Sequence, residues 1–360
     1  MKYKKVQLKD IADIVMGQSP KSQFYNTDGK GIPFLQGVRT FGENYPIIDT
    51  YTTSFNREAN VGEILFSVRA PVGRVNWATK RIAIGRGLAA IRVKERYSPN
   101  YLYYLFKKIG EHLDSLATGT VFTSINKKEL SELSIDIPAS VVDQERVANY
   151  LKKIDLKIEK NNQINDNLLE LAKASYRKVL AASNLTETKL KDFATITMGQ
   201  SPSSKTYNED KVGLALLNGA ADFRNGIHPS KWTTDPKRIV NKGSYIFGVR
   251  ATIGLTTKVF DKYAIGRGTG SAVSKDTAND EFLYFVLDDM FKYFSNSGSG
   301  SVYINISKSD FNDYIFCKPQ TNDLQKFHQT VGPIMNKIYT NKQENLILTQ
   351  VKETLLNKYF

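Results

Sequence analysis

The feature that most constrains this chain is an internal repeat. Residues 8–20 and 190–202 are identical at ten of 13 positions, at an offset of 182. At an offset of 181, three further segments return: VRAPVG as VRATIG, AIGRG unchanged, and GTVFTSINK as GSVYINISK. Solenoid repeats are 20–45 residues long, so a period of about 180 residues indicates duplicated domains. The 360 residues therefore predict two copies of one unit.

Each copy has the same order of local patterns. Short apolar runs bounded by glycine, such as residues 62–70 and 243–251, predict β-strands. Apolar residues at helical spacing follow Ser98-Pro99 in the first copy and Asn279-Asp280 in the second, which predicts a helix at each place. We therefore expect an α+β fold with two β-rich globular domains, each followed by a long helix.

The long helix of each copy carries apolar residues that alternate by four and three. The pattern includes a pair of asparagines at equivalent positions, which is typical of a coiled-coil seam with a polar layer. The predicted seam residues are Leu151, Ile154, Ile158, Asn161 and Asn165 in the first copy, and Val331, Ile334, Ile338, Asn341 and Asn345 in the second. Two helices that each pack on their own domain are the alternative. Pro333 should kink or restart the second helix.

These patterns predict four segments. The first globular domain covers residues 1–140 and its helix covers 141–183. The second globular domain covers residues 184–320 and its helix covers 321–360.

The net charge of +14 comes from 50 Lys and Arg against 36 Asp and Glu. Residues 1–140 carry +7 and residues 189–320 carry +4, so the excess lies mainly on the globular parts. Such an excess favours a polyanionic partner and says little about fold.

Arginine and lysine are the side chains that contact DNA phosphates and guanine edges. The candidate DNA-binding residues are Arg39, Arg69, Arg74, Lys80, Arg81, Arg86, Lys127, Arg224, Arg250, Arg267 and Lys308. Three of these residues in the first copy have the same residue type at the equivalent position of the second copy, namely Arg69/Arg250, Arg86/Arg267 and Lys127/Lys308. Such shared residues suit contacts with DNA that do not depend on its sequence, or they maintain the fold itself. Arg39 and Arg74 align with Ala220 and Leu255 and are candidates for reading different bases. For any single one of these residues, the simpler explanation is that it lies on a solvent-exposed face and contacts no DNA.

Several classes of protein are disfavoured. The sequence contains no phosphate-binding loop, no CxxC and no HExxH motif, and one cysteine with three histidines makes a poor metal site. We therefore predict no catalytic residues, no metal and no cofactor in this chain. The lone Cys317 cannot form an internal disulfide, and no apolar run is long enough to span a membrane, so a reducing compartment and the cytoplasm are expected.

The motifs together resemble a known family. MGQSP followed by YN, then GIPFLQG, VRAPVG, IGRGLAAI and DQERVANYLKKIDLKI, are similar to the specificity subunits of type I restriction-modification systems. The order of domain and helix, twice over, covers essentially the whole chain. The second copy departs from this pattern at its helix entry, and GIPF becomes GLAL.

The resemblance implies a division of labour. Each target-recognition domain would read one half of a split double-stranded DNA target, and the two helices would pair antiparallel as a spacer. The helices would also dock two methyltransferase subunits, which restriction endonuclease subunits join. S-adenosylmethionine, ATP and Mg would then serve those partners. Two alternatives are a protein-interaction scaffold built on the paired helices and an enzyme of an unrecognised class.

Overall fold

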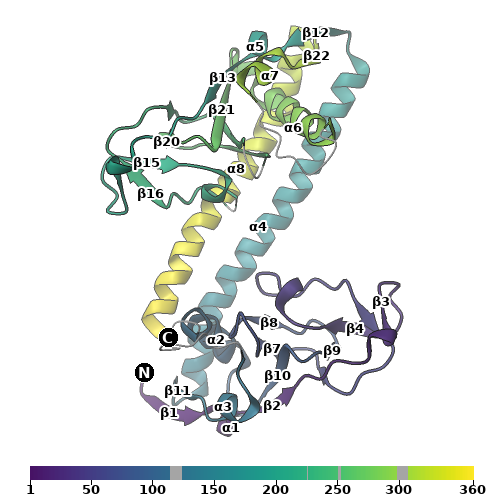
Figure 1. Ribbon diagram of the computed structural model, residues 1–360, viewed down its shortest axis with the longest axis vertical. Helices are drawn as coiled ribbons and strands as arrows, with labels where there is room; N and C mark the ends of the chain where they lie inside the picture. The colour runs from purple at the N-terminus through teal and green to yellow at the C-terminus, as the bar shows by residue number, and fades with distance from the viewer. Residues whose placement is uncertain (114–123, 225, 250–252, 298–306) are drawn as a thin grey trace. The chain divides into compact units, whose positions relative to one another are not determined.

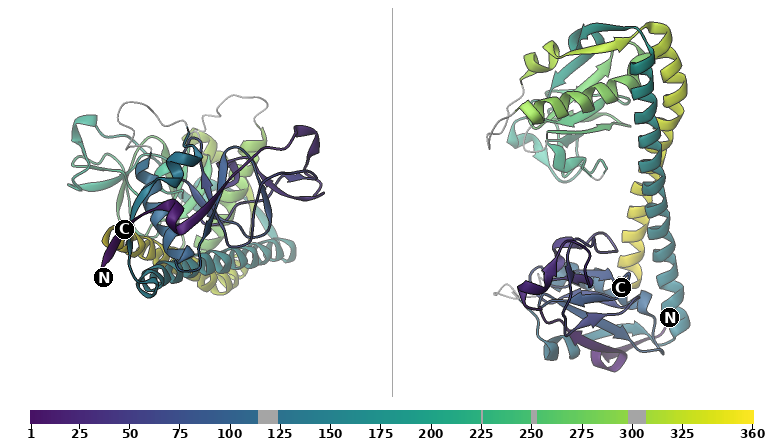
Figure 2. Two further views of the ribbon diagram at one scale, coloured as in Figure 1. Left: turned by 90° about the horizontal axis from the view of Figure 1, so that it is seen from below. Right: turned by 90° about the vertical axis from the view of Figure 1, so that its right-hand side faces the viewer.

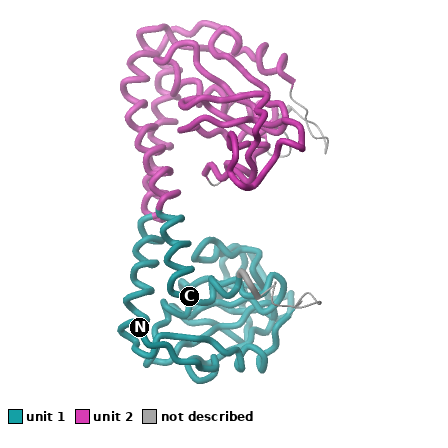
Figure 3. The backbone as a smooth tube through the Cα atoms, turned by 90° about the vertical axis from the view of Figure 1, so that its left-hand side faces the viewer, with its two compact units in different colours: residues 1–157, 348–360 teal, residues 158–347 magenta. Residues whose placement is uncertain are grey.

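In the computed structural model, the two copies of the repeat form matching sets of β-sheets. The structure describes residues 1–113, 124–224, 226–249, 253–297 and 307–360. The chain divides into unit 1, residues 1–157 with 348–360, and unit 2, residues 158–347 (Figure 3).

In its described residues, unit 1 contains three sheets, with strand orders β1-β11, β2-β10-β7-β8 and β3-β5-β4-β9-β6. All pairs are antiparallel except β4 with β9, which is parallel. The strands are β1 (Tyr3–Gln7), β2 (Ala12–Met16), β3 (Tyr25–Asn26), β4 (Ile32–Leu35), β5 (Tyr51–Thr52), β6 (Glu58–Ala59), β7 (Ile64–Ser67), β8 (Val75–Trp77), β9 (Ile82–Ile84), β10 (Leu88–Val93) and β11 (Ser134–Pro138).

Unit 2 repeats this topology, with orders β12-β22, β13-β21-β18-β19 and β14-β16-β15-β20-β17, and with β15 parallel to β20. Its strands are β12 (Leu185–Lys189), β13 (Ala194–Met198), β14 (Tyr207–Asn208), β15 (Leu214–Leu217), β16 (Lys231–Thr233), β17 (Ile239–Val240), β18 (Tyr245–Gly248), β19 (Gly254–Lys258), β20 (Tyr263–Ile265), β21 (Thr269–Ser274) and β22 (Ile315–Pro319). Figure 1 shows β13, β15, β20 and β21 together in one domain.

Each unit places an amphipathic helix beside its four-stranded sheet. In unit 1 this helix is α2 (Pro99–Leu113), where the Ser98 hydroxyl accepts a hydrogen bond from the backbone N–H of Tyr101 (3.1 Å). Proline at the first helical position loses no bond, because that N–H has no partner inside the helix. In unit 2 the helix is α6 (Asp280–Ser297). The short helices are α1 (Leu8–Ile11) and α3 (Lys127–Ser131) in unit 1, and α5 (Leu190–Phe193) and α7 (Lys308–Asp313) in unit 2.

The long helices are α4 (Val141–Ala182) and α8 (Thr321–Tyr359), and both units contain a segment of each. In unit 2 the Asn161 amide donates to the Asn345 amide oxygen (2.8 Å) and the Asn341 amide donates to that of Asn165 (2.9 Å). From Asn161 to Asn165 the residue number rises along α4, while that of the bonded partner on α8 falls from Asn345 to Asn341. The two segments are therefore antiparallel. Figure 2 shows them side by side within the unit.

The described residues of each unit form two apolar cores. The larger core of unit 1 joins the four-stranded sheet, α2 and both long helices, and it includes Phe66, Phe106, Leu151 and Leu356. The smaller core lies where β9, β10 and β7 meet, around Ile84. Unit 2 has corresponding clusters.

The α+β fold predicted from the sequence is confirmed. The antiparallel pairing of the long helices is present within each unit, through Asn161 and Asn345 in unit 2 and through Asp155 and Lys352 in unit 1. Of the two outcomes predicted at Pro333, a restart does not occur, because α8 is one helix from Thr321 to Tyr359, and a kink stays a prediction. Among the described helices, none has the length and apolar character needed to cross a bilayer.

Candidate nucleic-acid interface

Three loops meet backbone to backbone in unit 1 and form what we call cradle 1: residues 17–20, 35–37 and 84–88. The Gly17 N–H donates to the carbonyl of Leu88 (2.8 Å), and the Gly85 N–H donates to that of Leu35 (2.8 Å). A Cβ added at Gly17 would lie 2.1 Å from the carbonyl oxygen of Gly85. Only glycine fits at such an approach, because no side chain atom can come so close to a backbone oxygen.

The same construction recurs in unit 2 as cradle 2: residues 199–202, 217–219 and 265–269. The Gly199 N–H donates to the Thr269 carbonyl (2.9 Å), and the Gly266 N–H donates to that of Leu217 (2.9 Å). A Cβ at Gly199 would again lie 2.1 Å from a carbonyl oxygen, here that of Gly266. The repeated GQSP and IGRG segments therefore meet in space in both units.

A serine links the loops of each cradle. In cradle 1 the Ser19 hydroxyl accepts from the backbone N–H of Arg86 (3.1 Å) and pairs with the side-chain amide of Gln36 (2.8 and 3.0 Å). In cradle 2 the Ser201 hydroxyl accepts from the backbone N–H of Arg267 (3.2 Å) and lies 3.3 Å from the amide oxygen of Asn218.

Cradle 1 opens into a hollow of about 490 Å³. The rings of Tyr25 and Phe34, 4.7 Å apart, form part of its wall. Arg39 and Arg86 both line it, so the structure brings two of the predicted arginines together. The Arg39 guanidinium is held by Asp49 at 2.8 Å but stays 75% exposed.

The other predicted residues of unit 1 lie outside this hollow. Arg81 is paired with Glu58 at 2.6 Å, and Arg69 forms an isolated β-bridge with Ser124. Arg74, Lys80 and Lys127 are exposed. In unit 2, Arg224, Arg267 and Lys308 are exposed, and Arg250 lies outside the described residues.

Most of the predicted seam residues lie where the long helices meet. Leu151, Val331, Ile338, Asn161, Asn165 and Asn341 are buried, and Ile154, Ile158, Ile334 and Asn345 are partly buried. The asparagines join the two helices by hydrogen bonds, and Leu151, Val331 and Ile338 belong to the apolar cores of their units.

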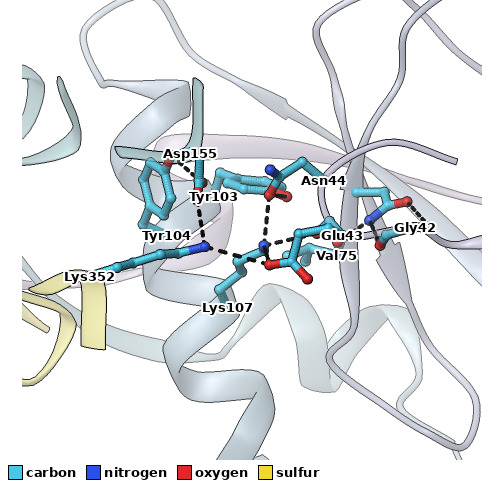
Figure 4. Close-up of polar contacts among 10 residues, drawn as sticks. Gly42, Glu43, Asn44, Val75, Tyr103, Tyr104, Lys107, Asp155 and Lys352 are labelled. Carbon is cyan, nitrogen blue, oxygen red and sulfur yellow. Dashed lines mark hydrogen bonds and ion pairs between the residues drawn. The ribbon is translucent and has the colours of Figure 1, made fainter. Parts of the chain in front are cut away.

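Unit 1 also contains a charged cluster that the sequence analysis missed (Figure 4). The ammonium group of Lys352, from α8, lies 2.6 Å from the carboxylate of Asp155 on α4, and both residues are only 9% exposed. Tyr104 donates to the same carboxylate (2.8 Å). Glu43 lies 3.2 Å from Lys107 and 3.5 Å from Lys352, which ties the loop before β5 to the helices.

Burial and the neighbouring charges shift the pKa values of several groups in this cluster. The Lys107 cation holds the pKa of Glu43 below its usual range. Burial lowers the pKa of Lys107, and the neighbouring Lys352 cation lowers it further. Burial also raises the pKa of Tyr104, so this hydroxyl keeps its proton and remains a donor to Asp155.

Unit 2 has an apolar layer at the corresponding place. At the repeat offsets, Asp155 corresponds to Met335, Lys352 to Ala172 and Tyr104 to Phe285, and all three belong to the buried core of unit 2. The sequence does contain a sign of this charged cluster, because Lys352 occupies a seam position that is alanine in the other copy. Cradle residues Ser19, Gln36 and Asn218 were also missed, although GQSP is repeated.

The chain has two tandem domains of one fold. Each domain has a glycine-packed cradle beside an exposed arginine, and each is continued by a long helix. These features define a class of duplicated binding proteins. A family model described as the type I restriction modification DNA specificity domain matches residues 1–170 and again residues 183–350. The chain belongs to this family.

Relatives of known name agree with this assignment. A putative type I restriction enzyme MjaX specificity subunit of Methanocaldococcus jannaschii is 43% identical over 147 residues, which cover 41% of this chain and 34% of that protein. The type I restriction enzyme MjaIX specificity subunit of the same organism is 25% identical over 98% of this chain and 91% of its own length. The crystal structure of a type I restriction-modification S subunit from M. genitalium has the same fold, with a TM-score of 0.68 at 19% identity, over 100% of this chain and 96% of that one.

Proposed function

We propose that this chain is the DNA-specificity subunit of a type I restriction-modification complex, and that each unit reads one half of a split double-stranded target. The observation that carries the proposal is the duplication of one cradle, with a fixed backbone and different side chains. A duplicated reader on one chain suits a target with two unequal halves, because each copy can change its side chains without changing the scaffold.

The excess positive charge supports the same function. The globular parts hold most of the net charge of +14, and the candidate arginines and lysines that the structure describes are largely exposed. Cationic side chains that neutralise phosphates displace condensed counterions, and this supplies binding that weakens with salt.

The long helices supply a second part of the proposal. Their seam is internal, but apolar residues remain exposed on their outer faces, among them Tyr150, Leu156, Ile164 and Leu171 on α4. In this proposal, these side chains contribute to the surface on which a protein partner docks. We infer that two methyltransferase subunits dock here and that restriction endonuclease subunits join them.

In this proposal the chemistry belongs to the partners. S-adenosylmethionine would serve the methyltransferase subunits, ATP and Mg would serve the restriction subunits, and this chain would act in the cytoplasm as the non-catalytic reader.

A domain exchange tests the function. Residues 1–140 are replaced by the corresponding domain of another specificity subunit, and the complex with its methyltransferase subunits is used to modify DNA, whose methylated sites are mapped. We expect one half-site to change while the other stays the same, because each unit reads separately. Exchange of residues 184–320 is the matched control and should change only the other half-site.

Two outcomes would contradict the proposal. A change in both half-sites after either exchange would exclude one reader per unit. Binding of the unaltered complex that does not weaken with salt, or that shows no sequence preference, would exclude the function itself.

A further inference from the structure

The two cradles share one backbone and one arginine but differ in the side chains around them. Arg86 and Arg267 occupy the same place beside the linking serine, as do the amides of Gln36 and Asn218. Phe34 and Arg39 of unit 1, in contrast, align with Leu216 and Ala221 at the offset of 182 that also relates Gln36 to Asn218. A common frame with varied contents is what two readers of different sequences require.

Each cradle contains an amide side chain that a serine contacts and whose oxygen packs against a glycine, Gly85 for Gln36 and Gly266 for Asn218. Gln36 and Asn218 follow strands β4 and β15 directly, and both residues are exposed. A primary amide has two N–H donors and an oxygen with two lone pairs. One serine hydroxyl cannot satisfy all of these groups, so each amide still offers both a donor and an acceptor to a ligand.

The arginine beside each amide keeps an uncompensated positive charge, although the Nε of Arg267 also donates to the Ser201 hydroxyl (3.5 Å). Within the described part of the chain, neither Arg86 nor Arg267 has a carboxylate partner. Their backbone N–H groups are fixed by Ser19 and Ser201 at 3.1 and 3.2 Å, which positions the base of each side chain. An exposed guanidinium at the same place in two readers suits the phosphate backbone, which is common to every sequence.

A donor and an acceptor on one planar group select adenine among the bases. The major-groove edge of adenine presents an N6–H₂ donor beside the N7 acceptor, and asparagine and glutamine pair with both at once. Guanine presents two acceptors there and is read by arginine instead. The donor and acceptor of each amide therefore suit adenine, and the cation beside it suits a phosphate.

We propose that Gln36 and Asn218 are specificity-determining residues, each pairing with an adenine in the major groove of one half-site, while Arg86 and Arg267 bind the adjacent phosphate. This inference rests on the proposed function and adds the reading groups. Arg39, with Asp49, borders cradle 1 alone and gives the first half-site a contact that the second lacks.

The test uses isosteric variants of the full chain in its complex with methyltransferase subunits. Gln36→Glu keeps the shape of the side chain but replaces the amide donor by an acceptor, and carboxylates accept from cytosine N4. We expect the preference at one adenine of one half-site to fall by about 5- to 150-fold and to shift toward cytosine. Asn218→Asp is the matched variant and should alter only the other half-site.

Arg86→Ala tests the phosphate contact. We expect weaker binding to all sequences and a drop of about one in the slope of log K against log salt, with the recognised sequence unchanged. Arg86→Lys should restore the slope, because it restores one cation.

The readout is selection of bound sequences from a random library, with the unaltered half-site as an internal test of folding. An unchanged preference in both Gln36→Glu and Asn218→Asp would overturn the inference while the proposed function stands. A change at a base other than adenine would overturn the assignment of adenine. Loss of sequence preference in the unaltered complex would instead overturn the proposed function.

Discussion

Gly17 shows how much of the reader depends on a single missing side chain. Its hydrogen bond to Leu88 and its close approach to the Gly85 carbonyl hold two loops together. Gly37, in the third loop of the same cradle, is different. It has an extended backbone, and an added Cβ would meet no atom within 4 Å.

This contrast gives a prediction on stability. Gly17→Ala should lower the free energy of unfolding by about 1–3 kcal/mol, because a backbone oxygen must move to admit the methyl group. Gly37→Ala should change it by less than about 0.5 kcal/mol. Urea denaturation of both variants measures the difference, and equal stabilities would show that the loops can separate freely.

At the same scale, the sequence singled out charged residues beside the hollow of cradle 1 but not the polar ones, and the DNA-binding role of the charged residues stays a prediction. Arg39 and Arg86 were candidates because a positive charge alone makes a residue a candidate for DNA binding. Both line the hollow of cradle 1. Gln36 carries no such mark, because an amide on a surface loop is common. Its role depends on the contact with Ser19, which lies 17 residues away along the chain.

Among the elements, the long helices show how two equivalent layers can be built from opposite chemistry. Unit 1 uses the ion pair of Asp155 and Lys352, and unit 2 uses Met335 and Ala172 at the corresponding positions. A buried ion pair gains little stability over an apolar layer, because desolvation offsets the attraction of the charges. Loss of one partner is costly, since it leaves a buried charge without compensation.

The exchange of these layers can be tested directly. Lys352→Ala alone should cost about 3–5 kcal/mol of the free energy of unfolding, because Asp155 loses its cation. The triple variant Tyr104→Phe, Asp155→Met and Lys352→Ala copies the unit 2 layer and should recover most of that loss. Chemical denaturation compares the three proteins, and a triple variant as unstable as the single one would contradict this account.

The four-and-three spacing of apolar residues predicted these helices, but it did not predict that α8 continues through Pro333. The seam of four and three placed both helices, with α8 found at Thr321–Tyr359. Pro333 does not end α8, although it removes the N–H that would bond the carbonyl of Gln329. Gln329 is exposed, so water can satisfy that carbonyl.

At the scale of the whole molecule, the repeat is not the same as the folded unit. Unit 1 takes residues 348–360 from the second copy of the repeat. Leu356 belongs to its buried core, and the ring of Phe360 stacks on Tyr101 with centroids 4.6 Å apart. The sequence repeat could not predict this exchange, because it compares the copies and does not show which helix end packs where.

Removal of residues 348–360 tests this exchange. The deletion should expose the apolar face of α2 and leave Asp155 without its cation, so the backbone amides of unit 1 should exchange hydrogen faster. Hydrogen exchange read by mass spectrometry reports each unit separately, and α6 of unit 2 serves as the internal reference. Unchanged protection of α2 would show that unit 1 is complete without the segment.

The exchange of helix ends also sets an order of events during synthesis. The 190 residues of unit 2 lie between residue 157 and the segment that completes unit 1. At 5–20 residues per second, the ribosome takes roughly 10 to 40 s to make them. For that interval the nascent first domain waits with Tyr101 and its neighbours uncovered. A chain whose translation stops before residue 348 lacks the segment that covers Tyr101 in unit 1.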